Sequence, residues 1–314
     1  MKEASIALGT WSWGAGAAGG DQVYGNHKSE EELHEVFDAA MDSGLNLWDT
    51  ATVYGMGASE DILGKFVRTV PRDGIFLSTK FTPQIAPMYG NDMEAMLDAS
   101  LERLGTDYVD LYWIHNPEDG VERWTADLGR MLKTGKVRRI GVSNHNLAQI
   151  KRVSEILAEQ GERLSAVQNH YSLLYRESED GGILDWCKEN DVDFFAYMTL
   201  EQGSLSGKYS SQNPLPADSQ RGQTYNPLMP QIDKLVAAMR PIAEAHGVNV
   251  AQVPIAWAIA KGTTPIIGVT SPAQVSDAAA AAACKLTADE MAALEEAARE
   301  TGVNTRGGWE RPMV

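Results

Sequence analysis

VRRIGVSNHNLAQIKRVSEILAEQGERLSAVQ, residues 137–168, is the stretch that decides the fold. Its two ends, 137–142 and 166–168, are short apolar runs with β-branched residues, which predict strands. Between them, residues 147–160 are amphipathic and long enough for a helix. A helix that joins two strands in this way makes them parallel members of one sheet.

The same unit repeats from one end of the chain to the other. The predicted strands cover residues 6–11, 45–49, 75–80, 108–114, 137–142, 166–168, 193–197 and 265–268. The predicted helices cover residues 29–43, 59–67, 92–104, 121–133, 147–160, 182–190, 230–246 and 250–260. Eight parallel strands close into a barrel, so we predict one α/β domain over residues 1–314, a (β/α)8 or TIM barrel. An open, doubly wound sheet is the alternative, but no G-x-G-x-x-G follows the first strand.

Two segments fall outside this alternation. Residues 200–228, after the seventh predicted strand, are rich in Ser, Gly, Pro and Gln. A loop of this length in a compact domain is usually functional or disordered. Near the end of the chain, LTADE at 286–290 is a capping signal that predicts a final helix ending near Glu300. Residues 301–314 are then expected to form an extended tail.

Composition and charge exclude several classes of protein. Of 314 residues, 43% are hydrophobic and 22% charged, which suits a packed core. The net charge of −16 disfavours nucleic acid and anionic membranes as partners. No apolar run reaches the ~18 residues of a membrane span and no signal-peptide pattern opens the chain, so we expect a cytoplasmic protein. Nothing in the sequence indicates the oligomeric state.

The sequence contains no recognisable metal motif. Cys187 and Cys284 are the only cysteines, and their spacing fits neither a disulfide framework nor a zinc site. No two histidines have metal-ligand spacing. We therefore expect no metal. Apart from His115, the histidines are expected to be ordinary core or loop residues, and this applies to His27, His34, His145, His170 and His246.

Polar side chains stand where three of the predicted strands end. Asp49, Lys80 and His115 follow or terminate the second, third and fourth strands, and Tyr54 comes five residues after Asp49. In a (β/α)8 barrel the carboxyl ends of all strands meet at one mouth, so we expect these four side chains to lie together. Taken singly, each residue has an ordinary structural explanation. Asp49 could be a turn cap and Tyr54 a packing residue. Lys80 could be a solvated charge and His115 a loop histidine. The prediction depends on their coincidence.

Together, these four residue types can protonate an oxygen atom. A lysine and an aspartate in a partly buried mouth are expected to pair. The lysine ammonium is expected to lower the pKa of Tyr54 from ~10 toward neutrality, which would make it an acid. His115 would orient a carbonyl oxygen. Because the set lacks a nucleophile and a metal site, the carbon of that carbonyl must receive something else, such as a hydride.

From Leu8 to about Trp309, the chain resembles the aldo-keto reductases. Eight motifs in the family's order carry the resemblance. They are LGTWSWG (8–14), WDTATVYG (48–55), SEDILG (59–64), STK (78–80), IHNP (114–117), GVSN (141–144), QNHYS (168–172) and GSLSGKY (203–209). The resemblance implies a (β/α)8 barrel that reduces an aldehyde or ketone with NAD(P)H, or catalyses the reverse reaction.

The resemblance also assigns roles to individual residues. Asp49, Tyr54, Lys80 and His115 match the catalytic tetrad, with Tyr54 as proton donor. The nicotinamide carboxamide is expected on Ser143, Asn144 and Gln168, its ring on Tyr197, and the pyrophosphate under a strap within 200–209. The full set expected at the cofactor is Gly9, Thr10, Trp11, Ser143, Asn144, Gln168, Tyr197, Thr199, Leu200, Gln202, Gly203, Leu205, Ser206, Gly207, Lys208, Gly268, Thr270, Gln274 and Asp277. A substrate pocket bordered by the first-strand loop, the segment 81–89 after Lys80, Trp113 and the C-terminal tail is expected to include Trp11, Tyr24, Trp113 and Trp309.

Two departures from the family pattern concern the cofactor. Residues 198–200 read Met-Thr-Leu where the family has Ser-Pro-Leu, so the strap geometry is expected to differ. NADPH-dependent members carry a basic residue after the eighth strand, whereas this chain has no Lys or Arg between Lys261 and Lys285. Asp277 in this segment favours a free ribose hydroxyl. NADP(H) is therefore the family expectation, and NAD(H) stays open.

Two other functions compete with reduction. The first is a redox-sensing or regulatory subunit that keeps the cofactor with little turnover, which the complete tetrad argues against. The second is a barrel enzyme of another class, such as a metal-assisted hydrolase or lyase, which the lack of clustered ligands at the strand ends argues against. The predicted partner is accordingly a small carbonyl or alcohol substrate.

Overall fold

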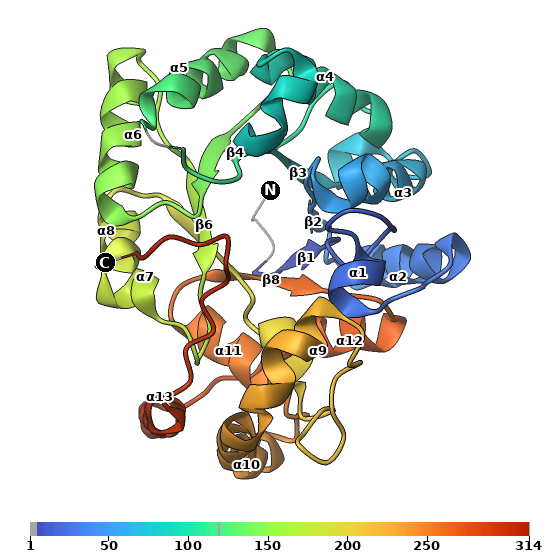
Figure 1. The fold of residues 1–314 in the computed structure, drawn as a ribbon, viewed down its shortest axis with the longest axis vertical. Coiled ribbons are helices and arrows are strands. Elements are labelled where there is room, and N and C mark those ends of the chain that lie inside the picture. The colour runs from blue at the N-terminus through green and yellow to red at the C-terminus, as the bar shows by residue number, and fades with distance from the viewer. Residues whose placement is uncertain (1–4, 119, 314) are drawn as a thin grey trace.

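The computed structural model describes residues 5–118 and 120–313 and confirms a closed barrel of parallel strands. Each strand pairs with the next, and β8 closes the ring on β1 (Figure 1). The strands are β1 (Ala7–Gly9), β2 (Leu47–Asp49), β3 (Phe76–Phe81), β4 (Leu111–Ile114), β5 (Ile140–Ser143), β6 (Ala166–His170), β7 (Asp193–Tyr197) and β8 (Thr264–Gly268).

Helices surround the barrel, as Figure 1 shows, and all the predicted ones are present. The longer helices are α2 (Glu30–Asp42), α3 (Ala58–Val67), α4 (Met93–Leu104), α5 (Glu122–Met131), α6 (Leu147–Glu159), α8 (Ile183–Glu189), α10 (Met229–His246), α11 (Gln252–Ala260), α12 (Pro272–Ala281) and α13 (Ala288–Thr301). The capping signal before α13 is confirmed, since Thr287 and Glu290 form a reciprocal capping box. After α13 the chain continues to residue 313 as a tail without regular secondary structure, apart from a turn.

The core has two parts. The larger lies between the strands and the helices, and the smaller fills the inside of the barrel. Inside the barrel, Trp113 and Phe195 meet edge to face with ring centroids 5.3 Å apart. This apolar layer closes the barrel below its mouth, so polar side chains at the carboxyl ends of the strands stand on an apolar floor.

The predicted long loop after β7 is more ordered than its composition indicated. Residues 200–228 contain the 3-10 turn η5 (Glu201–Ser206), the short helix α9 (Gln220–Tyr225) and the turn η6 (Asn226–Leu228). Two other short helices, α1 (Gly20–Tyr24) and α7 (Glu177–Asp180), were also not predicted. Each spans at most about two turns, which is too short to leave a hydrophobic period in the sequence. α1 contacts α9, so the loops after β1 and β7 meet over the mouth.

Among residues 5–118 and 120–313, no helix combines the length and the apolarity that crossing a bilayer requires.

Candidate active site

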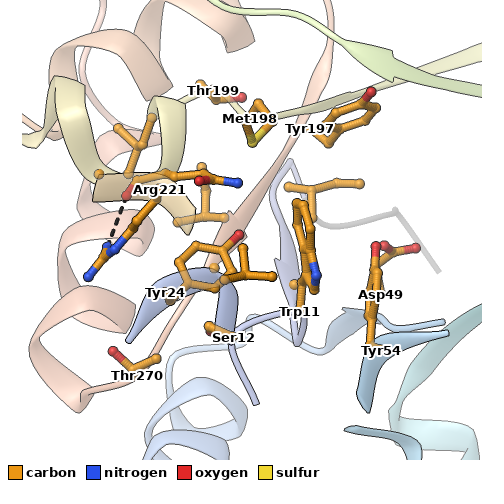
Figure 2. A pocket seen from close by; sticks show the side chains of 18 of the residues that line it. Trp11, Ser12, Tyr24, Asp49, Tyr54, Tyr197, Met198, Thr199, Arg221 and Thr270 are labelled. Carbon is orange, nitrogen blue, oxygen red and sulfur yellow. Dashed lines mark hydrogen bonds between the residues drawn. The ribbon is translucent and has the colours of Figure 1, made fainter. Parts of the chain in front are cut away.

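A cavity of about 1260 Å³ opens at the carboxyl ends of the strands. This is the end of a (β/α)8 barrel where ligands bind. The strand register sets its floor, because Asp49 is level with Gly9 on β1 and with Ser78 on β3. Figure 2 shows the aromatic, polar and charged side chains that converge on it.

Lys80 is the centre of the polar cluster and is fully buried. Its ammonium group donates to three acceptors: Asp49 Oδ2 at 2.5 Å, the carbonyl oxygen of Thr50 at 2.7 Å and Tyr54 Oη at 3.4 Å. An ammonium group has three hydrogens, so all of them are used. Because Lys80 donates to the phenol oxygen, the hydrogen of the Tyr54 hydroxyl is free to point elsewhere.

The carboxylate of Asp49 is held on both oxygens. Oδ2 accepts from Lys80, while Oδ1 accepts from Ser78 Oγ at 2.6 Å and from Gln168 Nε2 at 3.2 Å. This arrangement fixes the carboxylate beside the lysine. It also uses the amide nitrogen of Gln168 and leaves its Oε1 as an acceptor for a ligand amide.

The predicted direction of the Tyr54 pKa was wrong. Burial and the nearby charge of Asp49 raise the pKa of Tyr54 well above its usual value. Asp49 lies closer to the Lys80 ammonium than Tyr54 does, and its negative charge offsets part of the effect of the ammonium on the phenol. Burial also lowers the pKa of Lys80, although Asp49 opposes that change. Tyr54 is therefore a neutral phenol, a proton donor rather than a phenolate.

His115 is held as a neutral imidazole at the edge of the Tyr54 ring. Burial and the charge of Lys80 lower the pKa of His115 well below its usual value. Its Nδ1 lies 3.0 Å from the hydroxyl oxygen of Thr82. When that hydroxyl donates to Nδ1, Nε2 carries the ring hydrogen and can donate it to a substrate oxygen. The structure thus brings together all four residues predicted for the tetrad.

Most residues predicted at the cofactor line the cavity. They are Gly9, Trp11, Ser143, Asn144, Gln168, Tyr197, Thr199, Leu200, Gln202, Gly203, Ser206, Gly207, Lys208, Gly268, Thr270, Gln274 and Asp277. Two do not. Thr10 is buried beside Ser59, with which it shares a hydrogen bond of 2.8 Å, and Leu205 is buried in the core between barrel and helices. Their neighbours in sequence line the cavity, but these two side chains point away from it.

Aromatic rings form one wall of the cavity. The ring of Trp11 stacks beside that of Tyr54 at 5.6 Å and 18°. Tyr24 and Trp309 meet Trp11 edge to face at 5.6 and 5.8 Å. Figure 2 shows Trp11 standing between Tyr24 and Tyr54. Of these three predicted substrate residues, Trp11 therefore lies against Tyr54, and Tyr24 and Trp309 pack on Trp11.

The prediction for Trp113 was wrong. Its side chain belongs to the apolar layer inside the barrel and does not line the cavity. The side chain points into the barrel from within β4, two residues before His115, so it lies under the mouth. Whether an aromatic side chain on a strand lines the cavity or lies beneath it depends on its position along that strand.

Arg221 on α9 is a cavity residue that sequence reasoning missed. Its guanidinium carbon lies 5.5 Å from the centre of the Tyr24 ring and 5.4 Å from that of Tyr209. Nη1 donates to the carbonyl oxygen of Gln202 at 3.0 Å, drawn as a dashed line in Figure 2, while the buried Nε has no hydrogen-bond partner among the described residues. The sequence feature that could have indicated this role is that Arg221 is the one arginine within the long polar loop 200–228.

The donors in the cavity fit an anionic dinucleotide. Arg221 and Lys208 bring positive charge to the η5 strap, and a buried, unpartnered Nε suits an acceptor such as a phosphate oxygen. At the other end, the Gln274 side chain accepts from the Thr270 backbone N–H at 2.6 Å, and Asp277 adds negative charge. Positive charge therefore lies at the strap, and also at Lys28 and Arg311 elsewhere on the cavity lining, whereas the turn after β8 has none.

Comparison with known proteins extends this description. The sequence profile described as "Aldo/keto reductase family" matches residues 5–299. Over 311 residues the chain is 32% identical to a chloroplastic pyridoxal reductase of Arabidopsis thaliana, covering 94% of this chain and 83% of the relative. Over 265 residues it is 33% identical to an aldo-keto reductase of Schizosaccharomyces pombe named with NADP(+), covering 79% and 76%. A crystal structure of an aldo-keto reductase from Klebsiella pneumoniae in complex with NADPH is similar at a TM-score of 0.72 and 28% identity, covering 94% of this chain and 90% of that one.

Proposed function

The chain belongs to the aldo/keto reductase family and reduces carbonyl groups with NAD(P)H, and from that premise we propose that Tyr54 donates the proton. Asp49, Lys80 and His115 complete the machinery in this proposal. The supporting observation is the set of three hydrogen bonds from Lys80, which leaves the Tyr54 hydroxyl hydrogen free for a substrate oxygen.

Each residue has one task in the proposed step. When bound, the reduced nicotinamide supplies the hydride that the carbonyl carbon receives. Tyr54 and His115 hold the carbonyl oxygen, and Tyr54 transfers its proton as negative charge grows on that oxygen. Lys80 already donates to the phenol oxygen, so it stabilises the phenolate that forms. Asp49 keeps Lys80 charged in spite of burial.

Replacing Tyr54 by phenylalanine tests this assignment. The variant removes the donated proton and keeps the ring that stacks beside Trp11. We expect turnover to fall by several orders of magnitude while NADPH still quenches tryptophan fluorescence as in the wild type. Turnover within tenfold of the wild type would overturn the role of Tyr54.

One relative is named with NADP(+) and one similar structure contains NADPH, and we propose that this chain uses NADPH and also NADH. The absence of Lys and Arg between Lys261 and Lys285 supports weak selection for the 2′-phosphate. Asp277 lines the cavity, where its charge would repel that phosphate and its oxygens would accept from a ribose hydroxyl. Comparing the dissociation constants of NADPH and NADH tests this; a preference for NADPH of 100-fold or more would contradict it.

The substrate is proposed to be a small carbonyl compound with a planar, apolar body. The support is the aromatic wall of Trp11, Tyr24 and Trp309, in which Trp11 stacks beside Tyr54. Flat rings offer large contact area to a planar ligand at little entropic cost. A panel of aryl and short aliphatic aldehydes compared by kcat/KM tests this, with the aryl members expected to lead. A cytoplasmic location is likewise proposed, on the sequence evidence alone.

A further inference from the structure

His170, at the end of β6, is a fully buried histidine between two buried carboxylates. Its Nε2 lies 3.0 Å from Glu201 Oε1, and its Nδ1 lies 2.9 Å from Glu310 Oε1. Glu201 begins the η5 strap, whereas Glu310 belongs to the tail after α13. One ring thus joins two segments that are far apart in the chain.

The geometry requires a charged ring. A neutral imidazole has one acceptor nitrogen, and that nitrogen would face a carboxylate. Both carboxylates are otherwise surrounded by donors. Glu201 accepts hydrogen bonds from the hydroxyl groups of Ser172, Tyr225 and Thr305. Glu310 accepts from the Gly307 N–H at 2.6 Å and from the hydroxyl of Tyr197. Burial alone would lower the pKa of His170, but Glu201 and Glu310 offset it and raise the pKa to about 9.

His170, Glu201 and Glu310 form a bridge between the strap and the tail. Both of these segments form walls of the catalytic cavity. On the strap side, Gln202 and Gly203 follow Glu201 directly and line the cavity. Glu201 and Gln202 have left-handed backbone angles, φ 47° and 52°, which non-glycine residues keep only where the surroundings hold them. On the tail side, Trp309 and Arg311 flank Glu310 and line the cavity as well.

The bridge also reaches the wall expected to hold the nicotinamide. The hydroxyl of Tyr197 donates to Glu310 and lies 2.5 Å from Asn144 Oδ1. Figure 1 shows the tail running from α13 past β6 toward α7, which is the path that these contacts require. The tail is fixed again where the Met313 N–H donates to Glu177.

We propose that His170 is a positioning residue that fastens the strap and the tail to the barrel together, so that cofactor affinity and substrate affinity depend on one imidazolium. This inference rests on the proposed function, because it assigns the strap to the cofactor and the tail to the substrate. A buried ion triad is weak evidence for stability, so its use here is conformational.

His170 is also the group in this cluster that changes charge near pH 9. The other titratable groups that face it are Tyr175, stacked at 4.3 Å, and Tyr197, stacked at 5.5 Å, with Tyr225 behind Glu201. Burial raises the pKa of all three tyrosines further above their usual value. Because the folded-state pKa of His170 is raised, the bridge is complete at neutral pH and is lost as the pH rises through about 9.

His170→Gln tests the proposal, with His246→Gln as the matched control. His246 also pairs with a glutamate, Glu290, but it lies on α10 against the start of α13, outside the cavity. In the full-length protein we would measure the dissociation constant of NADPH by tryptophan quenching, and kcat and KM for para-nitrobenzaldehyde. We expect H170Q to raise both the dissociation constant and KM about tenfold, equal to ~1.4 kcal/mol each, and to change kcat much less. H246Q is expected to leave all three unchanged.

The pH profile separates positioning from folding. In the wild type, both constants are expected to rise as the pH passes about 9, and in H170Q neither should change there. If H170Q fails to fold, the wild-type profile and Glu310→Gln, which breaks one arm, still decide the matter. Constants for H170Q equal to those for H246Q, or wild-type constants that are flat through pH 9, would overturn the proposal. Failure of the wild type to bind NADPH would instead overturn the proposed function.

Discussion

Lys80→Met isolates what the buried ammonium contributes to stability and to catalysis. The change keeps the length of the side chain and removes all three hydrogen bonds to Asp49, Thr50 and Tyr54. Asp49 then remains as a buried carboxylate without its cation, which costs about 3–5 kcal/mol of unfolding free energy. Urea denaturation followed by tryptophan fluorescence measures that loss.

The catalytic loss follows from the distance between Lys80 Nζ and Tyr54 Oη. A phenolate 3.4 Å from an ammonium is stabilised by roughly 5 kcal/mol at an effective dielectric constant of about 20. Losing that interaction lowers kcat by three to four orders of magnitude. NADPH oxidation with an aldehyde, monitored by absorbance, measures this directly.

The double variant Lys80→Met/Asp49→Asn separates the two effects. It removes both charges, so we expect most of the lost stability to return, because a pair replaced by neutral groups leaves no uncompensated charge. Turnover should stay as low as in K80M. A double variant that regains wild-type turnover would refute the catalytic role of the ammonium, and a K80M variant as stable as the wild type would refute the buried ion pair.

Three further predictions concern pH, the barrel interior and the cofactor. As the pH rises into the alkaline range, kcat should fall when Lys80 loses its proton, because burial lowers its pKa while the Tyr54 pKa is raised; a rate that stays constant to high pH would contradict this. Trp113→Ala should lower the unfolding free energy by about 3–5 kcal/mol through the cavity it leaves, with the KM of the variant unchanged at a temperature where it is folded. A large change in KM would return Trp113 to the substrate pocket. Asp277→Lys should tighten NADPH binding about tenfold relative to NADH by supplying a charge-assisted contact, as judged by fluorescence titration. An unchanged ratio would place the 2′-phosphate elsewhere.

Sequence reasoning succeeded where a single strand end determines the position of a side chain. Asp49, Lys80 and His115 were predicted at the mouth because the carboxyl ends of parallel strands must meet there, and the structure brings them together. The prediction for Trp113 was wrong because Trp113 comes two residues before the strand end. Its side chain therefore lies inside the barrel, below the mouth.

What the sequence did not predict depends on contacts between distant segments. The pKa direction of Tyr54 depends on how deeply it is buried and on its distance from Asp49, and neither is encoded in spacing. His170 was expected to be an ordinary histidine. Its partners lie 31 and 140 residues away along the chain, so no local sequence pattern indicated that they meet. Arg221 reaches the cavity because the short helix α9 folds over the mouth. That helix is too short to show a helical hydrophobic pattern in the sequence.

The most direct test of the account is a titration of the cofactor-free protein with NADPH, followed by quenching of tryptophan fluorescence. Trp11 lies in the cavity and stacks beside Tyr54, so a nicotinamide bound there should quench it. The account predicts saturable binding of one NADPH per chain, with NADH binding at the same site. A protein that binds neither nucleotide would contradict the central claim that this cavity holds the hydride donor against Tyr54.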